Sequence, residues 1–150
     1  GVSGSGKSTY CRTWQTINDL VVSADDFFGH GDNYKKNFNP SKLGEAHAAC
    51  FKACVEGVLN PAVQRIFVDN TNTTAIEIAP YIALANAYGI PYEIVEFRVD
   101  HRVAVERNVH GVGWETIAAQ YKRLCQERLP PFWKRPISLV VESRVSTVKD

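Results

Sequence analysis

The stretch that decides the fold is GVSGSGKST, residues 1–9 of the 150-residue chain. It matches the pattern G-x-x-x-x-G-K-[ST], in which backbone N–H groups wrap a polyphosphate, the lysine reaches the terminal phosphates and the hydroxyl holds Mg²⁺. Residues 8–14, STYCRTW, continue directly into a predicted helix, which favours a phosphate loop over a flexible Gly/Ser-rich terminus. The residues expected to bind phosphate are Gly1, Ser3, Gly4, Ser5, Gly6, Lys7, Ser8 and Thr9.

A phosphate loop of this type joins the carboxyl end of a buried parallel strand to a helix. We therefore expect the first strand of the sheet upstream of Gly1.

Length and composition predict one domain, residues 1–150, with a hydrophobic core of its own. The formal net charge of +1 neither indicates nor excludes a nucleic-acid partner, because a channel can be locally basic. No apolar run approaches the roughly 20 residues that cross a bilayer, so we expect no membrane association. The four cysteines lack metal-site spacing, which favours reduced thiols in a cytoplasmic protein.

Residues 20–24, LVVSA, predict a short strand that is apolar on both faces, as buried parallel strands are. The strand is followed by Asp25 and Asp26. Ligands bind beyond the carboxyl ends of such strands, so these acids should share a crevice with the phosphate loop. Only one of them should point inward, because side chains alternate along a strand. A solvated turn or a helix N-cap is the alternative interpretation of the acid pair.

Residues 27–39 are rich in Gly, Asn, Asp, Lys and aromatic residues, a composition that predicts a functional surface loop. Amphipathic spacing then predicts a helix over about residues 40–60. His47 is placed on or beside the apolar stripe of this helix. A packing role is the alternative to a functional role for that histidine.

Residues 65–69, RIFVD, predict a second buried strand that ends in an acid. This segment has the form of a Walker B motif, whose carboxylate reaches the metal or its water shell. No acidic residue follows Asp69 directly, which favours phosphate transfer to an acceptor over hydrolysis. A helix over about residues 75–88 and a strand over residues 92–99 come next. This alternation predicts an α/β fold with a parallel sheet.

Residues 100–113 carry several cations and end in the glycine-rich sequence GVG. The composition predicts a charged helix closed by a glycine hinge, where a phosphotransferase places a mobile lid. The alternative for Arg102 and Arg107 is an ordinary solvated face.

An amphipathic helix is predicted over residues 114–129, and a strand over residues 137–141. Between them, residues 130–136, PPFWKRP, interleave basic and aromatic side chains. Such a segment either binds a single strand by stacking and charge or forms an ordinary packed loop.

These segments together resemble the AAA-type P-loop kinases, in particular the kinase domain of phage polynucleotide 5′-hydroxyl kinases. The likeness rests on the phosphate loop, SADDF at residues 23–27, LGEAH at 43–47, VDNTN at 68–72, and ERN at 106–108 followed by Gly111. It implies a three-layer P-loop NTPase fold with a parallel sheet and a lid at about residues 100–113. The strand order of this family implies that the expected upstream strand lies in the middle of the sheet, between a strand that ends at Asp69 and another at residues 94–97. Residues 1–150 alone should then show an unfilled position in the sheet or a sheet divided in two.

The resemblance implies an enzyme that transfers the γ-phosphate of ATP to the 5′-hydroxyl of DNA or RNA, with ATP and Mg²⁺ as cofactors. The implied acceptor is a single-stranded or 5′-end nucleic acid. By position, Asp25 would accept the hydroxyl proton, Lys7 would serve the phosphates, and Arg107 would be the lid cation. The expected metal ligands are Ser8 and Asp69. The expected substrate-binding residues are Asp69, Thr71, Asn72, His47 and Arg123.

Two positions depart from the pattern of the phage kinases. Phe28 stands where those kinases place an arginine after the acid pair, and His110 stands near their second lid arginine. The first departure weakens the expectation of a polynucleotide acceptor. The same scaffold also phosphorylates small molecules such as nucleosides, antibiotics or UDP-sugars, and in some phages modified DNA bases. A non-catalytic ATP-binding interaction module is the alternative of another class.

Overall fold

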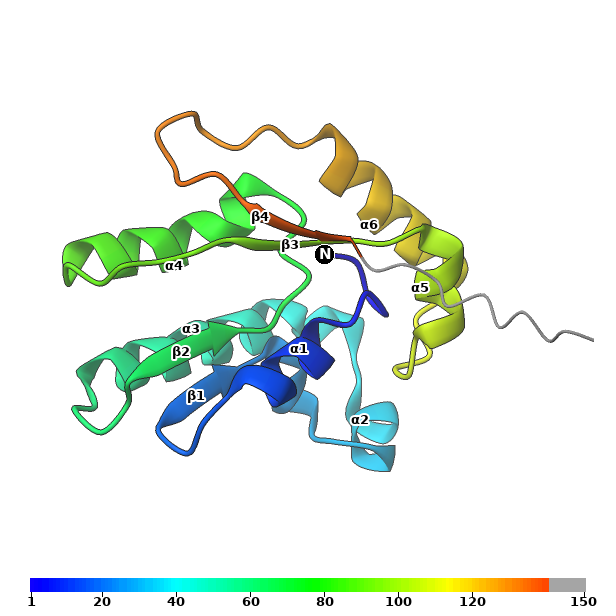
Figure 1. Ribbon diagram of the computed structural model, residues 1–150. Helices are drawn as coiled ribbons and strands as arrows, with labels where there is room; N and C mark the ends of the chain where they lie inside the picture. Colours follow the sequence, from blue (N-terminus) through cyan, green and yellow to red (C-terminus); the bar gives the residue numbers. More distant parts are fainter. Residues whose placement is uncertain (141–150) are drawn as a thin grey trace, which may run out of the picture.

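The phosphate-loop residues lead directly into the first helix, after which strands and helices alternate (Figure 1). The computed structural model describes residues 1–140. In the first half of the chain the elements are α1 (Lys7–Trp14), β1 (Asp19–Val22), the 3₁₀ turn η1 (Ala24–Phe28), α2 (Asp32–Asn37), the 3₁₀ turn η2 (Pro40–Lys42), α3 (Leu43–Leu59) and β2 (Arg65–Val68). They are followed by α4 (Ala75–Ala87), β3 (Val95–Arg98), α5 (His101–Arg107), α6 (Trp114–Gln126) and β4 (Ile137–Val140).

The four strands of the described residues form two separate parallel pairs. β1 pairs with β2, from Asp19 opposite Arg65 to Val22 opposite Val68. β3 pairs with β4 in a register that begins with Val95 opposite Ile137. Figure 1 shows the amino terminus close to β3, on the side of that strand that faces β1 and β2. The parallel pairing and the division of the sheet into two are both confirmed.

Each strand pair has its own hydrophobic core. Helix α3 packs on β1, β2 and η1. The buried side chains of this first core are Val22, Ala24, Phe28, Tyr34, Ala46, Cys50 and Cys54. The second core lies under α5 and α6, and its buried side chains are Val2, Val99, Ala104 and Ile117. Removing such side chains from water contributes about 25 cal/mol per Å² of apolar surface. Since Val2 belongs to the second core, the phosphate loop is fastened to the β3–β4 half.

The segment after β1 differs from the sequence prediction. β1 ends at Val22, and the acid pair lies in the first turn of η1 instead of directly after a strand. The hydroxyl oxygen of Ser23 accepts a hydrogen bond from the Asp25 N–H over 3.2 Å and so caps this turn. A serine oxygen at this position satisfies a backbone donor that a continuing strand would have to pair elsewhere. The turn is therefore a locally stable end for the strand.

The prediction of an irregular loop over residues 27–39 is wrong in part, because the segment contains α2. The sequence of this helix, DNYKKN, has no apolar periodicity that would predict it. It is held in place by Tyr34, which is 6% exposed and packs against the buried ring of Phe28. Tertiary packing thus stabilises a helix that local propensity does not favour.

The other predicted elements are present with adjusted bounds. The helix expected over residues 40–60 consists of η2 and α3, and the helix expected over residues 75–88 is α4. The strand expected over residues 92–99 is shorter, because ladder pairing with β4 covers only Val95–Arg98. Residue 141 of the predicted last strand lies outside the described residues. In the described part of the chain, every helix is too short or too polar to cross a membrane.

Candidate phosphate and acceptor site

The phosphate loop combines glycines in left-handed conformation with a helix N-terminus. Gly6 is the N-cap of α1 with φ 98°, and no side chain caps the first N–H groups of this helix. A Cβ on Gly6 would meet no atom within 4 Å, so the approach to these N–H groups is open. Free N–H groups at a helix N-terminus attract anions. The loop therefore offers a site that fits a phosphate.

The opposite side of the loop is packed tightly against the β3–β4 half. Gly4 has φ 78°, and a Cβ at this position would overlap the carbonyl group of Ala104 in α5. The N–H of Ser3 donates a hydrogen bond to Oε1 of Gln120 in α6 over 2.9 Å. The loop is thus fixed by α5 and α6 on one side and open on the other.

Lys7 lies where the loop meets two carboxylates. Its Nζ donates a hydrogen bond to the Val2 carbonyl oxygen over 2.8 Å. Burial lowers the pKa of Lys7, and the negative charges of Asp69 and Asp25 act against this shift. Both acids are therefore close enough to Lys7 to affect its charge. A phosphate group would supply the counter-charge that favours the ammonium form.

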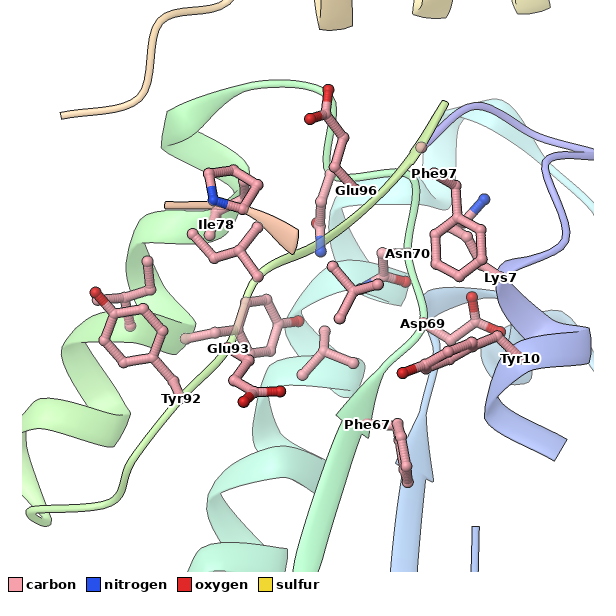
Figure 2. A pocket seen from close by; sticks show the side chains of 18 of the residues that line it. Lys7, Tyr10, Phe67, Asp69, Asn70, Ile78, Tyr92, Glu93, Glu96 and Phe97 are labelled. Atoms are coloured by element: carbon pink, nitrogen blue, oxygen red, sulfur yellow. The ribbon is translucent and has the colours of Figure 1, made fainter. Parts of the chain in front are cut away.

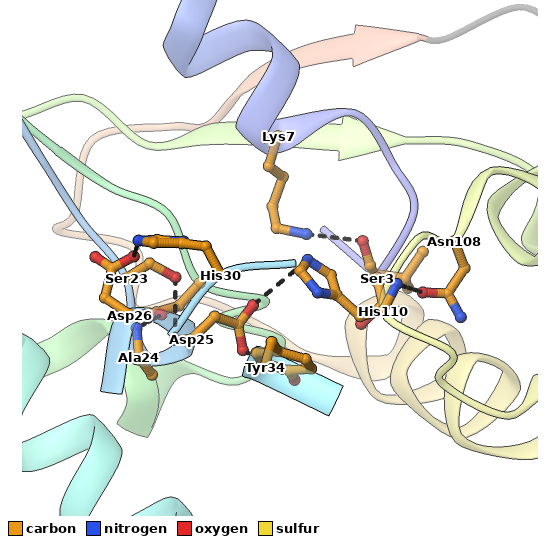
Figure 3. A network of polar contacts seen from close by, with 12 residues as sticks. Ser3, Lys7, Ser23, Ala24, Asp25, Asp26, His30, Tyr34, Asn108 and His110 are labelled. Carbon is orange, nitrogen blue, oxygen red and sulfur yellow. Dashed lines mark hydrogen bonds and ion pairs between the residues drawn. The ribbon is translucent and has the colours of Figure 1, made fainter. Parts of the chain in front are cut away.

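The carboxylate of Asp25 is contacted from two different elements, as Figure 3 shows. The Tyr34 hydroxyl of α2 donates to Oδ1 over 3.3 Å. The His110 Nε2, from the loop between α5 and α6, lies 3.9 Å from Oδ2. Asp26 is exposed and lies 3.7 Å from His30. One acid thus faces the phosphate loop and the other faces away, although a 3₁₀ turn and not strand alternation separates them.

The loop after β2 is tied to the segment that carries Asp25. The Asp69 N–H donates to the Val22 carbonyl oxygen over 2.9 Å and so extends the pairing of the strands. Asn70 is 8% exposed, and its Oδ1 accepts from the Ala24 N–H over 2.9 Å. Its Nδ2 lies 3.4 Å from the Cys50 Sγ in α3. Both ends of this amide are engaged, so Asn70 fixes the spacing between the two acids.

Sequence analysis did not single out Asn70 as a functional residue. The sequence signal that could have indicated Asn70 is its position directly after Asp69, at the end of a strand that must lie beside β1. A buried side chain with both a donor and an acceptor can join two backbone segments that have no other reason to be close.

The remaining residues of the loop after β2 meet the phosphate loop and α6. The Thr71 carbonyl oxygen accepts a hydrogen bond from the Gly1 nitrogen over 2.9 Å. Asn72 adopts a left-handed conformation with φ 42°. Arg123 Nε donates to the Thr73 hydroxyl over 3.3 Å. Arg123 of α6 thus reaches the loop that carries Asp69, Thr71 and Asn72.

Two other predicted site residues, His47 and Arg107, lie outside the contacts described above. His47 is exposed on α3, next to the fully buried Ala46, so it lies off the apolar face. Arg107 is exposed at the last residue of α5. The loop that follows Arg107 is shaped by Asn108, which donates to the Val112 carbonyl oxygen over 2.6 Å and accepts from the His110 N–H over 3.1 Å. This loop brings His110 to Asp25.

The basic and aromatic segment at residues 130–136 lies away from the acids. It precedes β4, which is parallel to β3, so it lies at the amino end of this strand pair. Its Lys134 N–H donates to the Tyr92 hydroxyl over 3.2 Å. The phosphate loop and Asp25 lie at the carboxyl ends of the strands. Residues 130–136 therefore do not lie beside the phosphate loop or Asp25, and the ring of Phe132 is 83% exposed.

A cavity of about 1650 Å³ separates β2 from β3 and reaches the phosphate loop (Figure 2). Its lining includes the apolar or aromatic side chains of Phe67, Ile78 and Tyr92 and the charged side chains of Lys7, Asp69 and Glu93. The volume exceeds that of ordinary small-molecule sites, which run to about 1,000 Å³.

Hydroxyl and carboxylate oxygens suit Mg²⁺, which keeps several waters and shares ligands with bound phosphates. Ser8 is exposed at the start of α1, and Asp69 is half-buried at the end of β2. Within residues 1–140, no cluster of three or more His, Cys, Asp or Glu side chains forms a metal site. Ser8 and Asp69 thus carry the kinds of oxygen that Mg²⁺ binds.

The parallel strands, the loop before α1 and the acid at the end of β2 define a P-loop α/β protein. Residues 1–111 match the AAA domain family, so the chain belongs to this family, which is of the P-loop kinase-like type. The match includes the phosphate loop and both acids that face Lys7.

A human protein, NEDD4-binding protein 2, is 33% identical to the chain over 123 residues. This alignment covers 78% of the chain but only 7% of the human protein.

Proposed function

We propose that the chain is a phosphotransferase domain that moves the γ-phosphate of ATP to a hydroxyl, most favourably the 5′-hydroxyl of DNA or RNA. Residues 1–150 would form one three-layer P-loop kinase domain, with a lid at about residues 100–113. The observation that carries the proposal is that Lys7 lies within electrostatic reach of Asp25 and Asp69, next to the N-terminus of α1, which no side chain caps. A phosphate-binding cation next to two carboxylates is the arrangement that phosphoryl transfer needs.

Asp25 is the residue best placed to act as the base. As the acceptor oxygen forms its bond to the γ-phosphorus, its proton passes to an Asp25 carboxylate oxygen. The bond between the γ-phosphorus and the bridging oxygen breaks, and the electron pair leaves with ADP. A positioned base typically contributes about 10²–10⁴ in rate. The Lys7 ammonium stabilises the charge that is spread over the transferring group.

Mg²⁺, when bound with ATP, would neutralise negative charge on the phosphates, and Ser8 and Asp69 would hold it. The side chain after Asp69 supports transfer over hydrolysis, because Asn70 is uncharged and both ends of its amide are engaged. It therefore has no free group to activate a water molecule.

Cations of α5 and α6 favour an acceptor that carries phosphates. Arg123 already contacts the loop after β2, and Arg107 is exposed on the adjacent helix. Thr71 and Asn72 would line the acceptor side of the same loop. The two arginines and this loop would bind the phosphates that follow the 5′-hydroxyl of a nucleic-acid strand.

A second candidate function is phosphorylation of a small molecule. The observation in its favour is Phe28, which is 2% exposed and packs with other aromatic rings. The segment after the acid pair thus supplies a buried ring and no cation for a polynucleotide phosphate. An ATP-binding module without catalysis is the third candidate, and it requires Asp25 to be dispensable.

A transfer assay with labelled ATP distinguishes these candidates. The complete protein that contains this domain is incubated with 5′-hydroxyl oligonucleotides, nucleosides and UDP-sugars, each over a range of salt concentrations. We expect label on the oligonucleotide and an acceptor KM that rises steeply with salt, as phosphate contacts require. Transfer to a nucleoside or UDP-sugar with a salt-independent KM would favour the second candidate. Absence of transfer to every acceptor, with ATP binding retained, would favour the third.

A further inference from the structure

Tyr34 is a buried polar residue whose hydroxyl lies beside the proposed base. It belongs to α2, and its side chain is 6% exposed. The hydroxyl donates to Oδ1 of Asp25 over 3.3 Å. Burial, followed by the Asp25 charge, raises the pKa of Tyr34 to about 12. The phenol therefore keeps its proton at neutral pH and remains a hydrogen-bond donor.

Aromatic neighbours hold the Tyr34 ring on several sides. Its centroid lies 6.0 Å from that of Phe28, 5.5 Å from that of Phe38 and 4.7 Å from that of His110. The Phe28 contact is edge-on and the Phe38 contact is stacked. Such aromatic pairs stabilise each other beyond the burial of apolar area alone. The ring thus has little freedom to turn its hydroxyl away from Asp25.

The two oxygens of the Asp25 carboxylate have different neighbours. Oδ1 faces Tyr34, whereas Oδ2 faces His110 at 3.9 Å. Lys7 acts on the same carboxylate from the phosphate loop, and the adjacent Asp26 is occupied with His30. Figure 3 shows Asp25 between Tyr34 and His110, with Lys7 on the side of the phosphate loop. Fixing Oδ1 therefore holds Oδ2 toward His110.

We propose that Tyr34 is a positioning residue that orients Asp25 for proton transfer. This inference rests on the proposed role of Asp25 as the base. Tyr34 would not touch the reacting atoms. It would hold one carboxylate oxygen by a hydrogen bond and leave the other free for the acceptor hydroxyl. A separation of 3.3 Å is long for O–H···O, and such hydrogen bonds often shorten only when the substrate is bound.

The direct test compares Tyr34→Phe with Tyr81→Phe. Both substitutions keep the aromatic ring and remove a hydroxyl from the β1–β2 half of the domain. The Tyr81 hydroxyl donates a hydrogen bond to the Cys50 Sγ over 3.3 Å, and Cys50 belongs to the same core as Tyr34. We expect Tyr34→Phe to lower kcat about tenfold with ATP affinity unchanged. The acid limb of its pH–rate profile should also differ from that of the parent, because a hydrogen-bond donor to the proposed base is lost. Tyr81→Phe should leave the profile in place.

A second readout does not depend on catalysis. The ¹³C signal of the Asp25 carboxyl at neutral pH in labelled protein should shift in Tyr34→Phe, because the carboxylate loses a hydrogen-bond donor, and should stay in place in Tyr81→Phe. An unchanged carboxyl signal and an unchanged pH–rate profile in Tyr34→Phe would overturn the proposal. Equal shifts in both variants would also overturn it, because they would indicate a general loss of packing.

Asp25→Asn in the same assays separates this inference from the proposed function. If Asp25→Asn loses transfer while Tyr34→Phe retains the parent profile, only the positioning role fails. If Asp25→Asn keeps full transfer, the proposed base is wrong, and the role of Tyr34 in orienting it fails with it.

Discussion

The β1–β2 half and the β3–β4 half of the molecule contribute different kinds of groups to the site. The β1–β2 half supplies the two carboxylates near Lys7, and buried contacts hold their segments in place. The β3–β4 half supplies His110 and the exposed cations Arg107 and Arg123. The acids to which we assign a proton-accepting and a metal-holding role thus lie on segments attached to the larger core, while the Asp25 side chain itself is half exposed. Groups that would meet a phosphate-bearing acceptor lie on the surface, where long side chains can adapt.

The phosphate loop joins these two halves. Val2 is 1% exposed in the core under α5 and α6, whereas Lys7 lies within electrostatic reach of the acids after β1 and β2. A change in the loop should therefore affect both halves. A change within one half should affect one function only.

The largest effect is expected at the junction itself. Lys7→Ala removes the cation that stabilises the transferring phosphoryl group, so kcat should fall by about 10²–10³ or more. Lys7→Arg should not restore it, because a planar guanidinium does not replace a compact ammonium in a tight loop. The assay is phosphate transfer from labelled ATP, with the exposed Lys52→Ala as the control. Turnover close to that of the parent in Lys7→Ala would remove the basis for the phosphate-loop interpretation.

Gly4→Ala should separate the loop from the β3–β4 half. The substitution forces a φ of 78° on a residue with a Cβ and drives this atom into the backbone of Ala104. We expect a stability loss of about 1–3 kcal/mol and weaker ATP binding. Gly44→Ala is the matched control, since a Cβ there meets nothing within 4 Å. Thermal unfolding and ATP titration measure the two effects, and equal stability of the two variants would contradict this account of the junction.

Asn70→Ala should loosen the β1–β2 half alone. The substitution leaves the Ala24 N–H without its partner, which costs about 1–3 kcal/mol for a buried group. Transfer should fall because the two acids are no longer held at a fixed spacing, while ATP affinity should change little. Denaturant unfolding with the exposed Asn86→Ala as the control tests this. Loss of ATP affinity without loss of stability would place Asn70 in the nucleotide site instead.

The smallest effect is expected at the far end of the β1–β2 pair. Hydrogen bonds from Arg65 and the Thr16 N–H hold the pKa of Asp19 below its ordinary value. A lowered pKa stabilises the fold above the unfolded-state value, and this contribution is lost as pH falls through the folded-state value. The stability difference between the parent and Asp19→Asn should thus be constant near neutral pH and fade below about pH 4. Denaturant unfolding at several pH values measures it, and a difference that persists at low pH would exclude this ion pair as its source.

Sequence patterns predicted the parts of the site that are fixed by local rules. The phosphate loop follows from glycine spacing, and the placement of Asp25 and Asp69 follows from the rule that ligands bind at the carboxyl ends of strands. Tyr34 could not be predicted in this way. Its helix lacks apolar periodicity, and its burial depends on Phe28 and Phe38 from outside that helix. Contacts between distant segments, such as His110 with Asp25, leave no periodic signal in the chain.

The most direct test of the central claim compares Asp25→Asn with Asp26→Asn in the complete protein. Each variant is assayed for ATP–Mg²⁺ binding and for transfer to a 5′-hydroxyl oligonucleotide. We predict that Asp25→Asn binds ATP as the parent does but loses about 10²–10⁴ in the transfer rate, because the acceptor hydroxyl then has no base. Asp26→Asn, whose side chain faces away toward His30, should stay close to the parent rate. Undiminished transfer by Asp25→Asn, or an equal loss in both variants, would contradict the proposed chemistry.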